Sequence, residues 1–194
     1  MTADTCDSKD SARLLGRSAR RAVPAEERQR HAEAAAERLL ALPEIARART
    51  VLAYAATPEE IDPAPAVEAL RARGVSIALP RVTGPGRLVL HRVDRGTTLV
   101  PGPFGLLEPT EDSPTVPPGE IDVAIVPGVA FDSACRRVGH GGGFYDRLDS
   151  MMEGAVTVGL AFDEQVLGRV PCEDHDVCVD VLVTPSRTFR REIP

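Results

Sequence analysis

Short apolar runs alternate with longer amphipathic or alanine-rich segments along most of the chain. Runs of five to eight apolar residues are typical of buried strands, whereas the longer segments are typical of helices. Strands alternating with helices predict one α/β domain with an open, mainly parallel sheet and helices on both faces. The expected strands are 49–56, 75–79, 87–93, 121–126, 156–161 and, last, 178–183, and the expected helices are 8–21, 24–42, 65–73 and 144–152.

Local signals support several of these boundaries. Pro24 suits the first position of a helix, and Gly74 suits the residue just past a helix end. The order of strand 49–56, helix 65–73 and strand 75–79 forms a β-α-β unit. Such a unit implies parallel strands and a right-handed crossover.

Two segments show no regular pattern. We expect residues 1–7 to be disordered and residues 8–194 to form the single domain. Residues 97–119 are dense in proline and glycine. A loop of that length is usually functional or mobile, although composition alone fits a surface connector equally well.

Composition and charge narrow the range of functions. With 194 residues the chain is long enough for a sizeable core, and its net charge of −6 argues against binding nucleic acid or an anionic membrane. No apolar run approaches the ~20 residues of a membrane span, and the polar start lacks a signal-peptide core. We therefore expect a cytoplasmic protein, by default a monomer.

The cysteines do not form a recognisable metal motif. Cys172, His175 and Cys178 are spaced three residues apart, which resembles part of a zinc site. A structural zinc site needs four ligands, and no fourth is evident. We expect reduced thiols and no zinc.

The segment from Arg136 to Asp146, R-R-V-G-H-G-G-G-F-Y-D, is the most informative part of the chain. Glycines let backbone N–H groups approach an anion closely, and arginines add fixed positive charge. The alternative, a tight turn, needs only one or two glycines. The segment matches neither the Walker phosphate loop nor the dinucleotide fingerprint, so it predicts a different kind of anion site.

Topology would bring this segment to other candidate residues. Ligands of open parallel sheets bind beyond the carboxyl ends of the strands. The loops after strands 49–56, 121–126 and 156–161 should therefore share one crevice, which would bring Glu60 and residues 163–176 near the glycines. Lys9 is the only lysine in the chain, and on composition alone it is equally a phosphate ligand or a tail residue.

Nearly the whole chain, from about Lys9 to Pro185, resembles the 5-formyltetrahydrofolate cyclo-ligase family. The most specific block is I-D-V-A-I-V-P-G-V-A-F-D followed by R-R-V-G-H-G-G-G-F-Y-D-R, within 121–147. Four weaker blocks accompany it in the family's order: P-E-E-I-D, F-G-L-L-E-P, G-L-A-F-D-E-Q and V-P with H-D-V-C-V-D. The resemblance implies a Rossmann-like fold.

The resemblance also implies an activity. Members of the family would convert 5-formyltetrahydrofolate to 5,10-methenyltetrahydrofolate with ATP and Mg²⁺, releasing ADP and phosphate. Phosphorylation of the formyl oxygen would make a leaving group, and a neighbouring folate nitrogen would close the ring. Phosphoryl transfer depends on positioning and charge neutralisation, which explains the need for cations and backbone donors.

The resemblance assigns the nucleotide site residue by residue. Lys9 and Arg13 lie four residues apart on one helix face, and that helix would be ordered or closed only with nucleotide present. Lys9, Arg137 and Tyr145 would be catalytic. The expected ATP ligands are Lys9, Arg13, Arg137, Val138, Gly139, His140, Gly141, Gly142, Gly143, Phe144 and Tyr145.

Metal and folate ligands follow in the same way. Asp146 and Asp176 would bind Mg²⁺, although each could also be an ordinary surface acid. Glu60 would accept hydrogen bonds from the pterin, and an aromatic ring at Phe104 would lie against it. The full set of expected substrate contacts is Ala55, Glu60, Phe104, His140 and Phe144.

The sequence departs from the family pattern at two positions. Many relatives have Tyr in place of Phe144, and Arg, Lys or Tyr in place of His140. The ring at Phe144 is kept, so we expect activity to be retained. If a protonated His140 binds phosphate, nucleotide affinity should weaken as the imidazole loses its proton.

Two other functions stay open from the residues alone. One is a sugar-phosphate isomerase or a CoA-transferase-like enzyme on a similar scaffold. The other is a non-catalytic module that binds folate or nucleotide. Neither of these functions requires ATP turnover by a site that combines Lys9, Arg13 and two acidic metal ligands.

Overall fold

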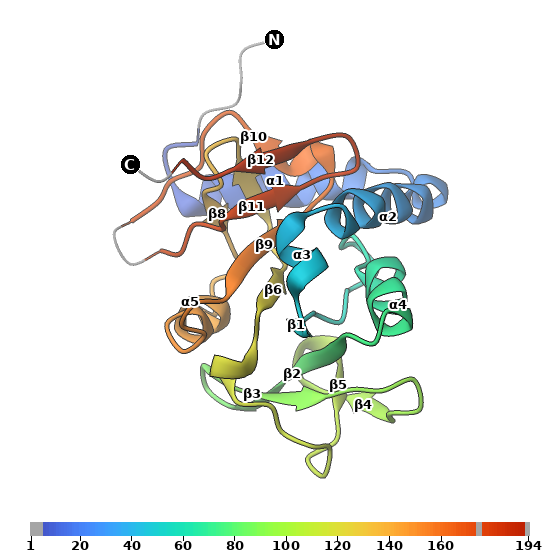
Figure 1. Ribbon diagram of the computed structural model, residues 1–194. Helices are drawn as coiled ribbons and strands as arrows, with labels where there is room; N and C mark the ends of the chain where they lie inside the picture. The colour runs from blue at the N-terminus through green and yellow to red at the C-terminus, as the bar shows by residue number, and fades with distance from the viewer. Residues whose placement is uncertain (1–5, 174–175, 193–194) are drawn as a thin grey trace.

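The computed structural model describes residues 6–173 and 176–192, with the side chain of Phe104 left out. Its centre is a seven-stranded sheet in the order β12-β11-β9-β6-β1-β2-β3 (Figure 1). The bounds of these strands, in chain order, are β1 Thr50–Leu52, β2 Ser76–Gly84, β3 Arg87–Arg92, β6 Val123–Val126, β9 Val156–Leu160, β11 Val181–Val183 and β12 Thr188–Arg190.

The five inner strands are parallel, and the two edge strands, β3 and β12, are antiparallel to their neighbours. From β1 the chain passes through helix α4 (Ala64–Ala72) to β2 on one side, and later returns to β6 on the other side. The strand order therefore reverses between β1 and β6. Ligands of open α/β sheets bind at such a point, outside the carboxyl ends of the strands.

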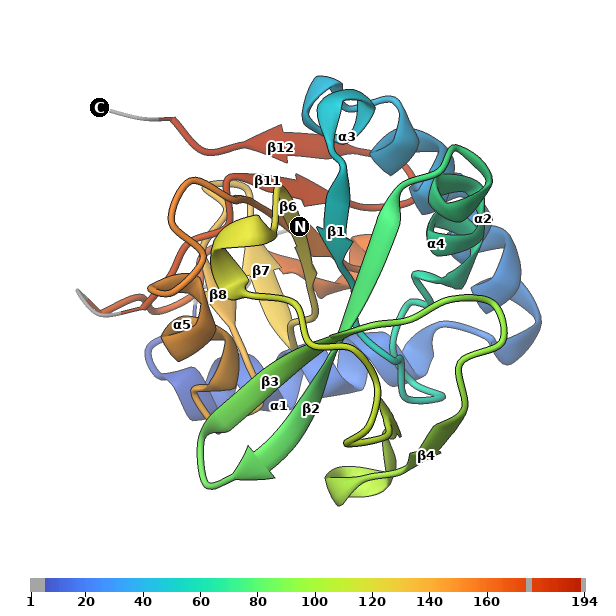
Figure 2. The same ribbon diagram turned by 60° about the horizontal axis from the view of Figure 1, so that its bottom comes forward.

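Helices cover both faces of the sheet, as expected. Helices α2 (Ala25–Leu40), α3 (Pro43–Arg47) and α4 pack on one face, and α5 (Phe144–Asp149) packs on the other (Figure 2). Side chains alternate between the faces because successive strand residues point in opposite directions. In β1, Val51 belongs to the core under α2 to α4, whereas Leu52 belongs to the core beside α5.

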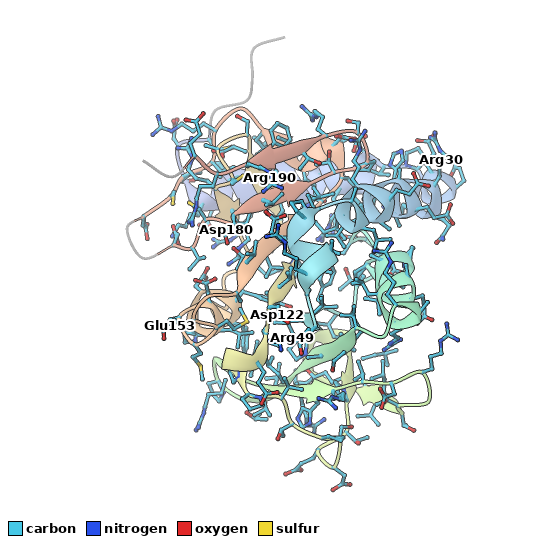
Figure 3. The ribbon with its side chains drawn as sticks, in the orientation of Figure 1. Arg30, Arg49, Asp122, Glu153, Asp180 and Arg190 are labelled. Carbon is cyan, nitrogen blue, oxygen red and sulfur yellow. The ribbon has the colours of Figure 1, made fainter. Side chains whose placement is uncertain are left out.

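Two aspartates fix neighbouring strands to each other where the strands begin. Asp122, just before β6, accepts hydrogen bonds from the N–H groups of Arg49 and Thr50 at 2.7 and 2.8 Å (Figure 3). Asp180, just before β11, accepts hydrogen bonds from the backbone N–H and the hydroxyl of Thr157, both at 2.9 Å. At the start of the neighbouring strand, each carboxylate accepts hydrogen bonds from donors that would otherwise lack partners. Both aspartates therefore help to set the strand register.

Helix α1 (Lys9–Ala22) lies against a smaller sheet of order β10-β7-β8, made of Val166–Leu167, Ala130–Asp132 and Arg137–Val138. Ser8 caps the helix by accepting a hydrogen bond from Ser11 N–H at 3.1 Å. At Gly16 a Cβ atom would lie 2.3 Å from the carbonyl oxygen of Val129. Only glycine allows this close approach, which holds α1 against the chain at the start of β7.

The structure corrects several expected boundaries. The strand expected at 49–56 ends at Leu52, because the chain leaves the sheet there. The helix expected at 144–152 ends at Asp149. The strand expected to be last, 178–183, contains β11 and is followed by a further strand, β12. A tight turn joins the two strands, which pair antiparallel. The segment 97–119 is not without structure: it contains the antiparallel pair β4 (Leu99–Pro101) and β5 (Leu107–Pro109) and the 3₁₀ turn η1 (Pro103–Gly105). A second 3₁₀ turn, η2 (Pro118–Glu120), begins at its end.

Cys6 lies in the segment that sequence alone assigns to an N-terminal tail. Its side chain is buried beside Ala12 and Val170, and its N–H donates to the carbonyl of Arg169 at 3.2 Å. Residues 1–5 lie outside the described residues. Among the helices of the described part of the chain, none is long and apolar enough to cross a membrane.

Candidate active site

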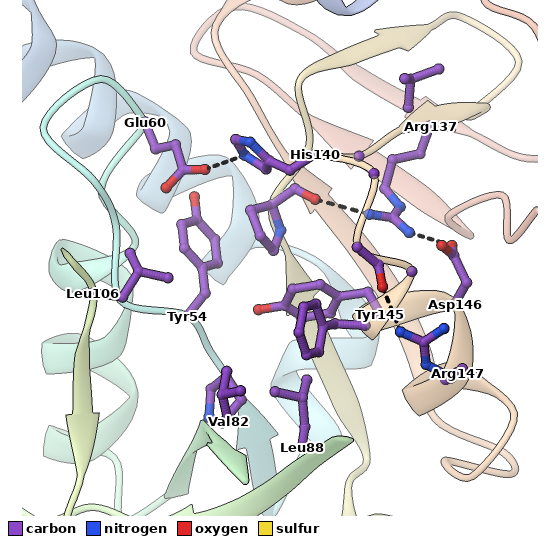
Figure 4. A pocket seen from close by; sticks show the side chains of 18 of the residues that line it. Tyr54, Glu60, Val82, Leu88, Leu106, Arg137, His140, Tyr145, Asp146 and Arg147 are labelled. Carbon is purple, nitrogen blue, oxygen red and sulfur yellow. Dashed lines mark hydrogen bonds and ion pairs between the residues drawn. The ribbon is translucent and has the colours of Figure 1, made fainter. Parts of the chain in front are cut away.

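A cavity of about 870 Å³ opens at the point where the strand order reverses (Figure 4). Its walls come from α1, the chain after β1, the β2–β3 hairpin, the end of η1 with β5, and the segment 137–147. All but one of the residues that sequence nominates as ligands line it, namely Lys9, Arg13, Ala55, Glu60, Arg137, Val138, Gly139, His140, Gly141, Gly142, Gly143, Phe144, Tyr145, Asp146 and Asp176. The exception is Phe104, whose side chain lies outside the described structure. Its contact with the ligand therefore stays a prediction.

The glycine-rich wall, residues 139–143, is a loop between β8 and α5. Gly141 and Gly143 have φ angles of 104° and 61°, a region that glycine adopts without steric cost. A Cβ atom at Gly142 would lie 2.7 Å from the ring of Phe144. The loop therefore needs glycine at these positions, and its open backbone faces the cavity as the sequence predicts.

Arg137 fixes the start of this wall. Its side chain is buried, donates to the carbonyl of Pro127 at 3.3 Å, and forms a short ion pair with Asp146 (Figure 4). The guanidinium also lies over the ring of Tyr145, 5.9 Å from its centroid. A buried, permanently charged group with several partners is well suited to hold a fixed position in an anion site.

Lys9 reaches the cavity from the first turn of α1. Its ammonium group lies 2.7 Å from a carboxylate oxygen of Asp176 and 2.9 Å from Glu173. Partial burial favours the neutral amine, but the two carboxylates outweigh this effect and raise the Lys9 pKa above its usual value. Lys9 is therefore charged at neutral pH and belongs to the cavity wall rather than to a free tail.

Arg13 extends the same face of α1 towards the glycine-rich loop. Its Nε donates to the carbonyl of Gly139 at 3.0 Å, and its Nη1 donates to Asp10 at 2.6 Å. Arg17, one turn further on, also lines the cavity. Lys9, Arg13 and Arg17 thus form a row of cations at intervals of four residues, as expected for one helix face.

Glu60 lies on the opposite side of the same opening. Its carboxylate contacts His140 Nε2 at 3.1 Å, the N–H of Thr57 at 2.9 Å and the guanidinium of Arg20 at 3.5 Å. Burial raises the Glu60 pKa, but the contacts with His140, Thr57 and Arg20 outweigh burial and hold the pKa below its ordinary value. Glu60 is therefore ionised, and its contact with His140 joins the two sides of the cavity (Figure 4).

The lower part of the cavity is apolar. Val82, Leu88 and Leu106 point into it from the β2–β3 hairpin and from the end of η1 (Figure 4). Tyr54 and Tyr145 present their rings between this apolar part and the charged residues above. The Tyr145 pKa is raised, chiefly by burial and then by the charge of Glu60, so its phenol stays protonated and is a hydrogen-bond donor.

Two carboxylates in the cavity have the chemistry of magnesium ligands. Asp146 and Asp176 are oxygen donors that each lie beside a cation, Arg137 and Lys9 respectively. Two carboxylates completed by phosphate oxygens and water suit the octahedral coordination of Mg²⁺. By the chemistry of their side chains, these two carboxylates could therefore hold a Mg²⁺ ion.

Two of the three residues in the cysteine–histidine spacing noted in the sequence, Cys172 and Cys178, are described. Cys172 and Cys178 bring their sulfur atoms to 3.8 Å, but no group of three potential ligands occurs among the described residues. His175, the third member of the spacing noted in the sequence, lies outside them. Within the described part of the chain, no disulfide joins any of the four cysteines.

Sequence reasoning missed several residues of the apolar half. Tyr54 lies two residues past the end of β1. The sequence predicts a longer strand that includes Tyr54, so the expectation that ligands bind beyond the carboxyl ends of strands does not point to it. Val82 and Leu88 carry no motif, and the F-G-L-L-E-P block contains Leu106 and Glu108 without assigning either a ligand role. They reach the cavity because the β2–β3 hairpin and β5 fold over the open edge of the sheet, which only tertiary structure decides.

Fold and cavity together define an α/β protein with a ligand site at the reversal of a parallel sheet, charged on one side and apolar on the other. The model of the 5-formyltetrahydrofolate cyclo-ligase family matches residues 6–185. The chain therefore belongs to the 5-formyltetrahydrofolate cyclo-ligase family and is an enzyme. This finding replaces the isomerase, CoA-transferase-like and non-catalytic alternatives.

Individual relatives agree with the family model. The chain is 35% identical to 5-formyltetrahydrofolate cyclo-ligase of Escherichia coli K12 over 179 residues, covering 89% of this chain and 98% of the relative. It is 33% identical to the enzyme of that name from Mycolicibacterium smegmatis, covering 93% and 95% of the two chains. The solved structure of Aquifex aeolicus 5,10-methenyltetrahydrofolate synthetase superposes with a TM-score of 0.82 at 34% identity, covering 96% of this chain and 94% of that one.

Proposed function

We propose that this enzyme converts 5-formyltetrahydrofolate to 5,10-methenyltetrahydrofolate and that cleavage of ATP to ADP and phosphate, by phosphoryl transfer to the substrate, drives the reaction. The observation that carries the proposal is one cavity with a cationic, glycine-rich wall beside an apolar floor. The first half suits a triphosphate, and the second suits a flat heteroaromatic ring. The family assignment supports the same conclusion.

The cationic half would bind ATP. Lys9 and Arg13 approach from α1, Arg137 approaches from β8, and the backbone of residues 139–143 lies between them. The formyl oxygen would attack the γ-phosphorus, and the bond from phosphorus to the ADP oxygen would break. Fixed cations stabilise the negative charge on the transferring phosphoryl group, and they need no reorganisation when that charge develops.

Ring closure would complete the reaction. The second folate nitrogen attacks the formyl carbon, loses its proton, and expels the phosphorylated oxygen as inorganic phosphate. Tyr145 stands between the two halves of the cavity and would donate its phenolic hydrogen to the formyl oxygen or to the phosphate. Glu60 would accept a hydrogen bond from a folate N–H group, and the rings of Tyr54 and Phe144 would pack against the pterin.

Asp146 and Asp176 would hold Mg²⁺. The ion would neutralise part of the negative charge of the nucleotide's phosphates. The proposal rests on the oxygen donors of the two side chains and on the cations beside them.

One assay tests the proposed function. The purified protein is mixed with 5-formyltetrahydrofolate, and the absorbance of the methenyl product is followed together with ADP release. We expect one ADP per methenyl product and no product when ATP or Mg²⁺ is omitted. Formation of methenyl product at the same rate without ATP, or ADP release without methenyl product, would contradict the proposal.

A further inference from the structure

Glu108 is a second carboxylate in the folate half of the cavity. It lies in β5, only 4% of the residue is exposed, and it lines the cavity. Its position is on the apolar side: it follows Leu106 along the chain and contacts β2 at Val82. Both of these neighbours face Arg137 across the cavity (Figure 4).

The hydrogen bonding of Glu108 is incomplete. Its one hydrogen bond within the described structure comes from the N–H of Val82, at a long 3.3 Å. None of the ion pairs formed by the described residues involves Glu108, and the nearby guanidinium of Arg81 donates instead to the carbonyl of Pro109 at 2.9 Å. A carboxylate has about four lone-pair sites, and burial makes unused sites costly.

Glu60 differs in this respect. It is also buried, but it already contacts His140, Thr57 N–H and Arg20. Of the two carboxylates on the folate side, Glu108 therefore has the larger unused capacity to accept hydrogen bonds. A ligand in the apolar half gains most by placing a pair of donors at Glu108.

Packing holds the Glu108 carboxylate in place. The backbone of Gly102 lies so close that a Cβ atom there would be 2.3 Å from the carboxyl carbon of Glu108. Pairing of β4 with β5 sets Val100 opposite Glu108. A fixed, planar acceptor pair favours a planar partner with two parallel N–H groups, because such contacts can be bidentate.

On the basis of the proposed function, we infer that Glu108 binds the 2-amino-4-oxopyrimidine edge of the pterin and so determines specificity for pterin-type rings. The 2-amino group and the adjacent ring N–H supply the two parallel donors. This orientation puts the pyrimidine at the apolar side and the formyl group towards the arginines. Glu60 would then accept hydrogen bonds from the remaining N–H groups of the folate.

The first test needs no mutation. Calorimetric binding of 5-formyltetrahydrofolate to the wild-type enzyme is compared with binding of its 2-desamino-2-methyl analogue, which lacks one of the two donors. We expect the analogue to bind roughly 10- to 100-fold more weakly, as for a lost hydrogen bond to a charged group. Equal affinity for the two ligands would overturn the inference.

Variants locate the effect at Glu108. Glu108→Gln should weaken binding of 5-formyltetrahydrofolate by roughly 10-fold or more but leave binding of the analogue and of ATP nearly unchanged. Gly102→Ala keeps the carboxylate of Glu108 but displaces it. This variant should therefore also weaken binding of 5-formyltetrahydrofolate and leave binding of the analogue and of ATP nearly unchanged. Glu68→Gln, at a carboxylate outside the cavity that pairs with Arg71, is the matched control.

The outcomes separate this inference from the proposed function. If wild-type enzyme makes methenyl product with ATP but Glu108→Gln weakens both folate ligands equally, the inference is wrong and the function stands. Thermal unfolding of each variant shows whether the fold is kept. Should Glu108→Gln not fold, Gly102→Ala decides: weaker binding of 5-formyltetrahydrofolate with unchanged binding of the analogue supports the inference, and unchanged binding of both ligands overturns it.

Discussion

Arg137 and Asp146 form an ion pair inside the cavity, although they belong to opposite halves of the proposed magnesium–ATP site. Arg137 is the proposed phosphate ligand, and Asp146 is the proposed metal ligand. Lys9 and Asp176, which also line the cavity, repeat this relationship. Each cation therefore compensates the negative charge of a carboxylate, which explains how several charges of both signs can share one partly buried site.

The first prediction concerns Asp146. In Asp146→Asn the neutral amide is a weaker metal ligand, so the Mg²⁺ concentration that gives half-maximal activity should rise about tenfold or more. The measurement is a magnesium titration of methenyl formation at saturating ATP. Glu153→Gln, at an exposed acid shortly after α5, is the control and should titrate like the wild type. A normal titration of Asp146→Asn would remove this residue from the metal site.

The second prediction concerns Lys9. Lys9→Ala should raise the KM for ATP and lower kcat, with a combined loss in kcat/KM of roughly 10- to 100-fold, because a charged hydrogen bond to phosphate is lost. Steady-state kinetics with varied ATP measure both constants. Arg21→Ala removes another cation of α1, one that is exposed and pairs with Glu59 outside the cavity. If the two variants behave alike, Lys9 has no special role.

Glu60 gives a prediction about substrate preference. Glu60→Ala should raise the KM for 5-formyltetrahydrofolate by roughly tenfold or more and change the KM for ATP much less, because the lost acceptor faces the folate. The kinetics are measured with each substrate varied in turn. Equal damage to both constants would indicate instead that Glu60 mainly holds His140 and the glycine-rich loop in place.

The same residue predicts a pH dependence of stability. The pKa of Glu60 is lower in the folded protein than its ordinary value of 4.5, so the carboxylate form favours folding. Its contribution is fully present above that ordinary value and is lost as pH falls through the lower folded pKa. We therefore expect the difference in free energy of unfolding between wild type and Glu60→Gln to shrink as the pH falls. Urea unfolding between about pH 6 and pH 3 measures this difference. A constant difference across this range would contradict the prediction.

Gly16 tests how helix α1 is attached. Gly16→Ala would put a Cβ atom 2.3 Å from the Val129 carbonyl, so α1 must shift. We expect a loss of roughly 1–3 kcal/mol in the free energy of unfolding, together with weaker ATP binding because Lys9 and Arg13 move with the helix. Gly96→Ala is the control, since nothing lies within 4 Å of a Cβ atom there. Unchanged stability and ATP affinity in Gly16→Ala would show that the helix tolerates the shift.

The sequence by itself determined the local structure and the charged half of the site. Apolar runs, helix signals and the glycines of 139–143 act over short distances, so they can be read from neighbouring residues, and the parallel order brings Glu60 to the same edge. Tertiary structure alone decided the apolar half, the ion pairs of Arg137 with Asp146 and of Lys9 with Asp176, and the place of Glu108. These features join segments far apart in the chain, and their geometry depends on how the β2–β3 hairpin, β5 and α1 pack over the sheet, which no local pattern specifies.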